Sequence, residues 1–195
     1  MTQNDQHYIS KILDGDTRAF AILVDRYKDL VFTLALRMLK NREEAEEVSQ
    51  DTFIKVFKSL GKFKGDSKFS TWIYRITYNG CLDRLKKHKQ EYNCIPLDDY
   101  TERKLMKLDN AIDAMETQEQ QQTIKECLRL LPKEDAFLLT LYYYEEQSLE
   151  EISKIMGITA NYVKVKLYRS RKKLTSILKE KLEPEIIEHY ERERK

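Results

Sequence analysis

The chain contains few residues that interrupt a regular backbone, and this scarcity constrains its fold more than any other feature. Among 195 residues there are only 5 Gly and 3 Pro, whereas 41% are hydrophobic and 35% are charged. A sandwich or barrel of many short strands needs a turn roughly every 8–12 residues, and such turns are rich in Gly and Pro. We therefore expect an all-α protein.

Hydrophobic periodicity predicts a first group of helices. Apolar residues recur at three- and four-residue steps from Asp16 to Lys40, which is typical of a long amphipathic helix. Asn41 is a suitable N-cap for a second helix that continues to Leu60. A basic, loop-like segment, 62–67, then leads into a third helix from about Ser70 to Lys87. Three such helices can enclose a small core.

A second group of helices follows a segment, from Lys87 to about Met115, in which the apolar pattern decays. One helix begins near Glu119 and ends at Pro132, and another covers 133–144. Ser148 and Glu151 form an S-x-x-E capping box for a short helix that ends at Gly157. A last long helix covers 160–182, so the order of elements is that of a helix-turn-helix.

These patterns predict two small helical domains joined by a flexible acidic linker. The first domain covers 1–88, the linker 89–117, the second domain 118–182 and a charged tail 183–195. The formal net charge is only +2, but the charge is strongly segregated along the chain. Segments 61–90 and 159–181 are basic, whereas 91–120 and 133–151 are acidic. Basic islands on helical modules indicate polyanion binding, with an ordinary solvated surface as the alternative.

The last helix has the side-chain pattern of a DNA-recognition helix. On a helical wheel its apolar residues and Ser170 share one face, and the opposite face carries Asn, Val, Tyr, Arg and Lys side chains that suit base edges: Asn161, Val165, Tyr168, Arg169 and Lys172. Flanking cations are better placed for phosphates: Lys164, Lys166, Arg171 and Lys173. The alternative is a basic helix on a helical bundle without a DNA function.

The third helix of the first domain pairs aromatic and cationic side chains. Tyr74, Arg75 and Tyr78 fall together on the side away from its apolar stripe. Aromatic faces stack unpaired bases while cations follow the backbone, so this face is better suited to single-stranded nucleic acid than to a duplex. The alternative is a tyrosine-rich protein interface. We expect Trp72, on the apolar stripe, to lie in the core.

The second helix has a mixed outer face that suits protein docking. Apolar and charged side chains alternate there: Glu47, Gln50, Asp51, Ile54, Phe57 and Lys58. Exposed apolar residues ringed by charge are typical of a partner-binding surface. Phe57 packing beneath the preceding helix is the alternative.

The sequence lacks the signatures of several other classes of protein. There is neither a membrane-spanning apolar stretch nor a secretory signal, so we expect a cytoplasmic protein without membrane insertion. Cys81, Cys94 and Cys127 form no CxxC pair and indicate buried thiols. The three His residues have no metal-ligand spacing, and nucleotide-binding and nucleophile motifs are missing. We expect no enzyme, catalytic residue, metal or cofactor.

Three runs of sequence resemble the extracytoplasmic-function (ECF) group of bacterial sigma factors, over about Asp14 to Leu178. They are REEAEEVSQDTFIKVF, FKGDSKFSTWIYRITYNGCLDRLKK and LPKEDAFLLTLYYYEEQSLEEISKIMGITANYVKVKLYRSRKKL. The resemblance implies a two-domain, all-helical initiation factor that binds core RNA polymerase and promoter DNA. The first domain would be sigma region 2 and the second sigma region 4.

The resemblance also assigns expected roles to residues. The polymerase contact would be Glu47, Gln50, Asp51, Ile54 and Phe57. The minus-ten, single-strand site would be Lys62, Lys64, Gly65, Asp66, Ser67, Tyr74, Arg75, Tyr78 and Asn79, with Asn79 partly structural. The minus-thirty-five reader would be Asn161, Tyr162, Lys164, Val165, Lys166, Tyr168, Arg169 and Lys172. The acidic linker would follow the polymerase's RNA path.

The resemblance further implies an anti-sigma partner, membrane-associated, that covers these surfaces, and we expect a monomer when the chain is free. The sequence departs from the family where the recognition helix reads NYVKVK in place of GTVKSR, so its promoter cannot be inferred. The charged tail after Pro184 is also unusual. Two other functions fit the residues alone: a stand-alone, dimeric helix-turn-helix regulator, and a helical protein-interaction adaptor.

Overall fold

The computed structural model describes residues 3–91 and 126–181, and the regular structure in these segments is helical, which confirms the all-α prediction. The first domain contains α1 (Gln3–Leu13), α2 (Ala19–Leu39), α3 (Arg42–Ser59), a 3-10 turn (Leu60–Lys62) and α4 (Phe69–Glu91). The second contains helical residues 126–130, α6 (Lys133–Leu139), a π-helical turn (Thr140–Tyr144), α7 (Leu149–Met156) and α8 (Ala160–Lys181). Residues 89–91 of the expected linker, 89–117, belong to α4, and the rest of that linker and the tail lie outside the described residues.

The chain reverses between α2 and α3 at the predicted position. Lys40 adopts a left-handed conformation, φ 59°, and its N–H donates to Leu36 O, which closes the last turn of α2. Asn41 is the N-cap of α3, and its side chain accepts a hydrogen bond from Glu44 N at 3.1 Å. Glu43 and Glu44 lie in the positive first turn of α3, where acidic side chains are favourable.

The core of the first domain follows the predicted stripe of α2. Leu23, Val31, Leu34 and Met38 are fully or almost fully buried, and α2 packs against α1, α3 and α4. Burial of each such side chain stabilises the fold by about 1.5–3 kcal/mol before entropic costs. α4 contributes Ile73 from the side facing this core.

A buried carboxylate holds α1 on the rest of the first domain. Asp5 forms an ion pair with Arg26 and accepts a hydrogen bond from Tyr27 Oη at 2.7 Å. Tyr27 in turn makes an edge contact with Tyr74 of α4, with ring centroids 6.3 Å apart. Helix α1, which precedes the first helix predicted from the sequence, is therefore an integral layer of the domain.

The second domain is a helix-turn-helix whose turn is fixed by its predicted caps. Ser148 Oγ accepts from Glu151 N at 3.2 Å, and the Glu151 carboxylate accepts from Ser148 N at 2.9 Å. Gly157 ends α7 at φ 70°, a conformation that favours glycine. These elements set the angle at which α8 leaves the turn.

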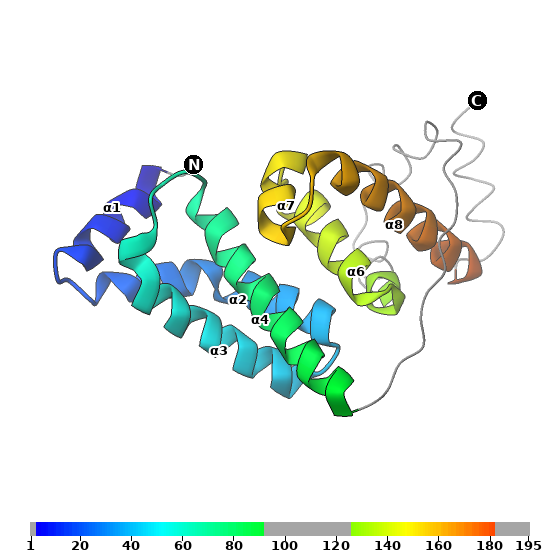
Figure 1. Ribbon diagram of the computed structural model, residues 1–195, viewed down its shortest axis with the longest axis horizontal. Coiled ribbons are helices and arrows are strands. Elements are labelled where there is room, and N and C mark those ends of the chain that lie inside the picture. The colour runs from blue at the N-terminus through cyan, green and yellow to red at the C-terminus, as the bar shows by residue number, and fades with distance from the viewer. Residues whose placement is uncertain (1–2, 92–125, 182–195) are drawn as a thin grey trace.

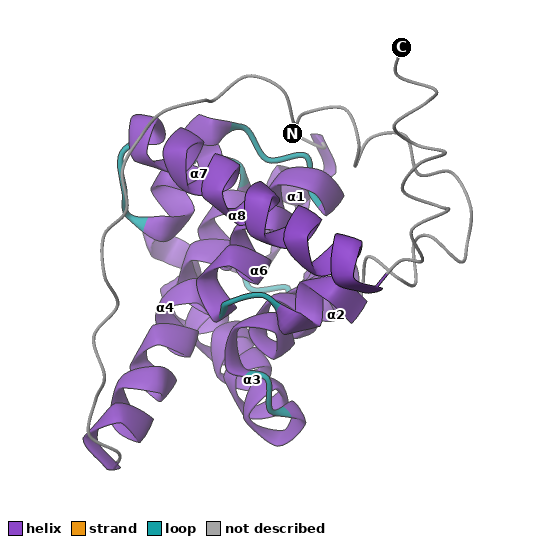
Figure 2. Ribbon diagram, turned by 90° about the vertical axis from the view of Figure 1, so that its right-hand side faces the viewer, coloured by secondary structure: helices purple, strands orange, loops and turns teal. Residues whose placement is uncertain are grey.

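The two domains pack directly against each other. Helix α7 contacts α4, and α6 contacts α2 (Figures 1 and 2). Lys40 Nζ donates to Leu131 O at 2.7 Å, and the rings of Tyr78 and Phe137 lie 5.0 Å apart. The expected separation of two domains along the chain is thus accompanied by a close interface that periodicity did not predict.

Two further observations concern the described residues. Cys81 and Cys127 are buried free thiols, whereas Cys94 lies outside the described segments. None of the helices in residues 3–91 and 126–181 is long and apolar enough to cross a membrane.

Candidate nucleic-acid interface

Helix α8 presents a polar and basic face on the side opposite its buried stripe. Val163, Leu167, Ser170 and Leu174 are buried, as the helical wheel predicts. The side chains expected to face DNA are exposed or half-buried: Asn161, Tyr162, Lys164, Val165, Lys166, Tyr168, Arg169 and Lys172. This face has the hydrogen-bonding groups and positive charge that a major groove accepts.

Some of the flanking cations serve the protein's own packing. Lys166 Nζ lies 2.6 Å from Glu134, and Lys173 Nζ lies 2.7 Å from the buried carboxylate of Asp135. Arg171 lies over the rings of Tyr142 and Tyr143. Acidic and aromatic side chains of α6 and the π-helical turn thus contact these three cations in this conformation, while their placement for phosphates stays a prediction. Lys164 remains exposed.

A buried polar network sets the position of α8 on α6. Asp135, 5% exposed, accepts hydrogen bonds from Ser170 Oγ and Lys173 Nζ, both at 2.7 Å. Such charge-assisted bonds are stronger than neutral ones and hold a side chain in one geometry. Asp135 did not stand out from the sequence, where it reads as one more acid in the first turn of a helix.

The loop between the 3-10 turn and α4 forms one wall of a cavity of about 360 Å³. Loop side chains and one face of α4 line it, together with one lysine from α7: Lys62, Phe63, Lys64, Asp66, Ser67, Thr71, Trp72, Arg75 and Lys154. Thr71 Oγ1 is buried without a hydrogen-bond partner. A cavity of this size with aromatic, cationic and hydroxyl groups is suited to a single nucleobase.

Trp72 belongs to this cavity as well as to the core. It is half-buried, and its ring lies 5.2 Å from Phe63 and 5.8 Å from Phe69 between centroids. The prediction that Trp72 is a core residue therefore describes only one side of the ring. Gly65 has φ 78°, so the loop bends at a position where glycine is favoured.

The two tyrosines of α4 are buried, contrary to the expectation of an exposed stacking face. Tyr74 is 2% and Tyr78 6% exposed. Tyr74 packs on Tyr27 of α2 and donates to Glu145, and Tyr78 packs on Phe137 of α6, so both domains contribute to the burial of these tyrosines. Arg75 and Asn79, at intervening positions, remain exposed.

Burial also changes the acid–base properties of these groups. Burial, with the nearby carboxylate of Glu145, raises the pKa of Tyr74, and burial raises the pKa of Tyr78 to about 12. Burial likewise raises the pKa of Glu145 above that of an ordinary glutamate, while the hydrogen bond from Tyr74 opposes this. Both tyrosines are therefore neutral at physiological pH.

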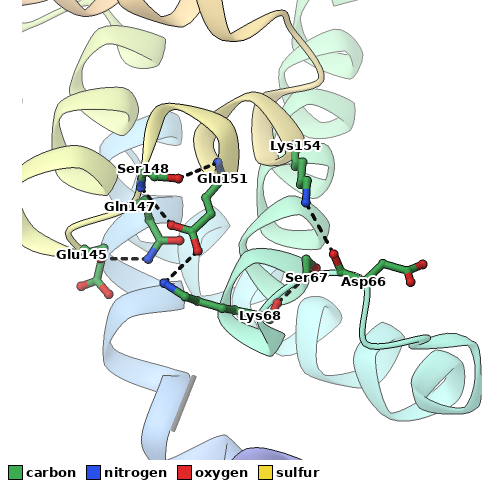
Figure 3. Close-up of polar contacts among 8 residues, drawn as sticks. All are labelled: Asp66, Ser67, Lys68, Glu145, Gln147, Ser148, Glu151 and Lys154. Atoms are coloured by element: carbon green, nitrogen blue, oxygen red, sulfur yellow. Dashed lines mark hydrogen bonds and ion pairs between the residues drawn. The ribbon is translucent and has the colours of Figure 1, made fainter.

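Acidic and basic groups of the second domain contact polar groups of the first (Figure 3). Lys68 Nζ lies 2.8 Å from Glu151, and Lys154 Nζ lies 3.5 Å from Asp66 O. Tyr74 Oη donates to Glu145 at 3.1 Å. Burial opposes ionisation of Glu151, but hydrogen bonds from Lys68 and Ser148 outweigh it and hold the pKa of this carboxyl below its usual value.

The outer face of α3 is solvent-accessible, as predicted. All five expected contact residues are exposed: Glu47, Gln50, Asp51, Ile54 and Phe57. Ile54 is 50% and Phe57 43% exposed, although Phe57 also makes an edge contact with Phe20 of α2 at 5.0 Å. Phe57 therefore packs in part against the preceding helix, as the alternative expected, while the rest of its ring stays exposed.

A groove between α3 and α4 extends this face. Its volume is about 490 Å³, and Glu47, Asp51 and Arg84 are among its lining residues. Arg84 forms ion pairs with Glu44 and Glu47. Sequence reasoning missed Arg84, because periodicity within one helix does not show which neighbouring helix a side chain reaches. In the described segments no group of three or more His, Cys, Asp or Glu side chains could hold a metal ion.

Comparison with known proteins matches both domains in their order along the chain. The family model for Sigma-70 region 2 matches residues 23–91, and that for Sigma-70, region 4 matches residues 121–174. The ECF RNA polymerase sigma factor SigW of Bacillus subtilis (strain 168) is 34% identical over 178 residues, covering 88% of this chain and 95% of the relative. The chain belongs to the ECF RNA polymerase sigma factors.

Other relatives agree with this assignment. The RNA polymerase sigma-H factor of Pseudomonas aeruginosa is 30% identical over 185 residues, with 90% of this chain and 94% of the relative covered. The ECF RNA polymerase sigma-E factor of Escherichia coli (strain K12) is 29% identical over 173 residues, with 86% and 90% covered. This ECF sigma factor thus acts in transcription initiation, within a family that is not enzymatic.

Solved structures share the fold. CnrH, in complex with the cytosolic domain of CnrY, has a TM-score of 0.62 at 21% identity, covering 90% of this chain and 97% of CnrH. The sigma factor RpoE, in complex with the anti-sigma factor NepR from Bartonella quintana, has a TM-score of 0.61 at 18% identity, covering 82% and 96%. The family models for both regions, with the SigW relative, favour the sigma factor over a stand-alone regulator or an adaptor.

Proposed function

We propose that this ECF sigma factor divides promoter recognition between its domains, so that α8 reads duplex DNA upstream and the first domain captures the melted nontemplate strand. In this division, region 2 covers residues 1–88 and region 4 covers 118–182. The linker between them covers 89–117, and a charged tail covers 183–195. The observation that carries the proposal is the base-sized cavity beside the 62–67 loop, on a different domain from the exposed recognition face.

The α8 face supports the upstream role. Arg169 and Lys172 can contact guanine edges, and Asn161 can pair with adenine. Lys164 is better placed for phosphate. The remaining predicted positions border the same face: Tyr162, Val165, Lys166 and Tyr168.

The cavity supports the strand-capture role. Trp72 offers an aromatic surface for an unstacked base, and Arg75 can neutralise a nearby phosphate. The predicted minus-ten residues of the loop line the cavity or adjoin it: Lys62, Lys64, Gly65, Asp66 and Ser67. A protein that binds only the unpaired base shifts the duplex toward the open state, because its affinity differs between the two states.

The exposed α3 face supports docking on core RNA polymerase. Ile54 and Phe57 supply apolar area, and acidic residues surround them. Holding both DNA-binding domains on one polymerase raises their effective concentration, so neither domain needs high affinity alone. We further propose that the chain is a cytoplasmic monomer when free, works without catalysis of its own, and is regulated by an anti-sigma factor, as the partners in the two solved complexes suggest.

Run-off transcription with purified core polymerase tests this function. Promoters selected from a DNA library should be transcribed only when the chain is added, and permanganate should modify unpaired thymines near the start point. Replacing Trp72 with Ala should reduce permanganate reactivity while binding of closed duplex persists.

Trp72→Phe is the matched control, because it keeps an aromatic ring and should retain most melting. If core polymerase with the chain opens no DNA at any selected promoter, the assignment of strand capture is wrong. If melting persists unchanged in Trp72→Ala, the cavity is not the capture site.

A further inference from the structure

Helices α3 and α4 lie side by side, and a glycine permits their close approach (Figure 1). A Cβ atom added at Gly80 of α4 would lie 3.2 Å from Val48 Cγ1 of α3, which is shorter than an ordinary van der Waals contact. Arg84 follows Gly80 by one helical turn, and on α3 Glu44 precedes Val48 by one turn while Glu47 adjoins it. The close spacing of the helices therefore brings the Arg84 side chain onto α3.

The ion pairs of Arg84 connect a largely covered carboxylate to an exposed one. The exposed fraction of the side chain rises from 16% at Glu44 to 31% at Arg84 and 61% at Glu47. Arg84 Nε is buried and lies 3.6 Å from Glu44 Oε1, whereas Arg84 Nη2 forms the ion pair with Glu47. Arg84 is therefore held from beneath by Glu44 and restrains Glu47 at the surface.

The anchor at Glu44 is itself fixed by the start of α3. The N–H of Glu44 donates to the side chain of the N-cap, Asn41, at 3.1 Å. A capped first turn has little freedom to fray, so the Glu44 carboxylate leaves the helix from a defined backbone position. The restraint on Glu47 thus begins in the cap of α3 and passes through a residue of α4.

Glu47 belongs to the exposed α3 face that we propose docks on core RNA polymerase. An ionised carboxylate has room for about four hydrogen bonds on its two oxygens. Only Glu47 Oε2 takes part in the ion pair with Arg84, and most of the side chain is open to solvent. Glu47 can therefore pair with Arg84 and accept a hydrogen bond from a partner at the same time.

We propose that Arg84 is a positioning residue for polymerase docking: from α4 it holds the Glu47 carboxylate in one orientation on the α3 face, so that core polymerase meets a preformed acceptor. The inference rests on the proposed function for the identity of the partner. Ordering a long side chain during association opposes binding, and an ion pair already present in the free chain removes this cost. Arg84 acts through Glu47 and is not itself a contact residue.

A double-mutant cycle on binding to purified core polymerase tests this role with the full chain. Arg84→Ala should weaken binding by about threefold to tenfold, the range expected when one long side chain has to be ordered on association. In a Glu47→Ala background Arg84→Ala should cause no further loss, because the side chain that it positions is missing. An equal loss in both backgrounds would overturn the proposal, since Arg84 would then act independently of Glu47.

Arg42→Ala is the matched control for the loss of one positive charge. Arg42 forms an ion pair with Glu46 within α3, at 2.9 Å, and its side chain is 80% exposed. This pair does not involve the predicted contact residues, so polymerase affinity should stay at the parent value. A loss as large as that of Arg84→Ala would overturn the proposal in favour of a general effect of charge.

Arg84→Lys separates orientation from charge at the same position. Arginine presents a planar fork that reaches two carboxylates, whereas a lysine ammonium is a single point charge. Arg84→Lys should therefore show most of the loss seen in Arg84→Ala. Full recovery of affinity would show that a positive charge at this position is enough, and would overturn the positioning role.

Circular dichroism and denaturant unfolding check that Arg84→Ala is folded. If it is not, Glu44→Gln takes its place, because it weakens the anchor of Arg84 and leaves the docking face intact. Unchanged polymerase affinity in Glu44→Gln would also overturn the proposal.

Ile54→Asp distinguishes failure of this inference from failure of the proposed function. Loss of affinity in Ile54→Asp without coupling between Arg84 and Glu47 would overturn the positioning role alone. Parent-like affinity in Ile54→Asp, Glu47→Ala and Arg84→Ala would overturn docking through α3, and with it this inference.

Discussion

Glu151 accepts hydrogen bonds from two directions, from Ser148 N at 2.9 Å within its own helix cap and from Lys68 Nζ at 2.8 Å across the domain interface. One carboxylate thus both starts the helix-turn-helix and attaches it to the first domain. Its low pKa reflects these two partners, which outweigh the effect of burial.

Two substitutions separate these roles of Glu151. Glu151→Gln keeps the acceptor of the capping box, since Gln also serves at this position, but loses the charge opposite Lys68. We expect it to weaken domain closure by roughly 0.2–1 kcal/mol, because Lys68 is partly exposed. Glu151→Ala should lose about a further 1 kcal/mol of helix stability. The distance between the domains measures closure, and denaturant unfolding measures helix stability. If Glu151→Gln and Glu151→Ala lowered the free energy of unfolding equally, the dual role of Glu151 would be contradicted.

Asp135 is expected to fix the orientation of α8. Asp135→Ala leaves the Ser170 hydroxyl, which is fully buried, without its partner and removes a charge-assisted bond to Lys173. Such losses cost about 1–3 kcal/mol, so unfolding should shift to lower denaturant and upstream DNA affinity should fall. Glu134→Ala, on the adjacent and partly exposed residue, is the control and should cost less than 1 kcal/mol.

Arg169 and Lys164 should contribute to DNA binding in different ways. If Arg169 contacts a guanine, Arg169→Ala should cost about 1–3 kcal/mol and relax preference at one base pair. Lys164→Ala should weaken binding on all sequences and reduce the slope of log affinity against log salt by about 0.9. Titrations of the polymerase complex on promoter variants at several salt concentrations measure both. An Arg169 effect that is the same on every sequence would exclude base readout.

Ile54 should contribute to polymerase affinity without supporting the fold. Its side chain is 50% exposed, so Ile54→Asp should leave the unfolding free energy within about 0.5 kcal/mol of the parent. Loss of a central apolar contact in an interface typically costs more than about 1 kcal/mol of binding. Leu13→Asp, at a residue 54% exposed on α1, is the matched control. Equal polymerase affinity for the two variants would place the docking surface elsewhere.

Tyr78 should make the folded chain sensitive to alkaline pH. Its pKa is raised from 10.0 to about 12, so the folded state retains a proton that the unfolded state loses. Stability from this group is fully present below about pH 10 and is lost as pH rises toward 12. Unfolding measured across this range should show a decline that is shallower in Tyr78→Phe. A slope unaltered by that substitution would show that Tyr78 stays accessible to solvent.

Much of the local structure could be predicted from the sequence because it depends on neighbours along the chain. The Asn41 cap, the Ser148–Glu151 box, the Gly157 turn and the buried stripe of α8 all follow from spacing within one helix or turn. The exposed Ile54 and Phe57 follow from the same periodicity. The tail and most of the linker lie outside the described residues.

The surroundings of α4 depended on tertiary structure. Periodicity grouped Tyr74 and Tyr78 with Arg75 on the side away from the apolar stripe, but a helical wheel cannot show that Phe137 and Glu145, distant in sequence, contact the tyrosines while Arg75 stays exposed. Likewise, the opposite charges of two segments are visible in the sequence, whereas their pairing requires the packing of α7 on α4. Backbone geometry determines which side chains share a face, and long-range burial of apolar area determines what that face meets.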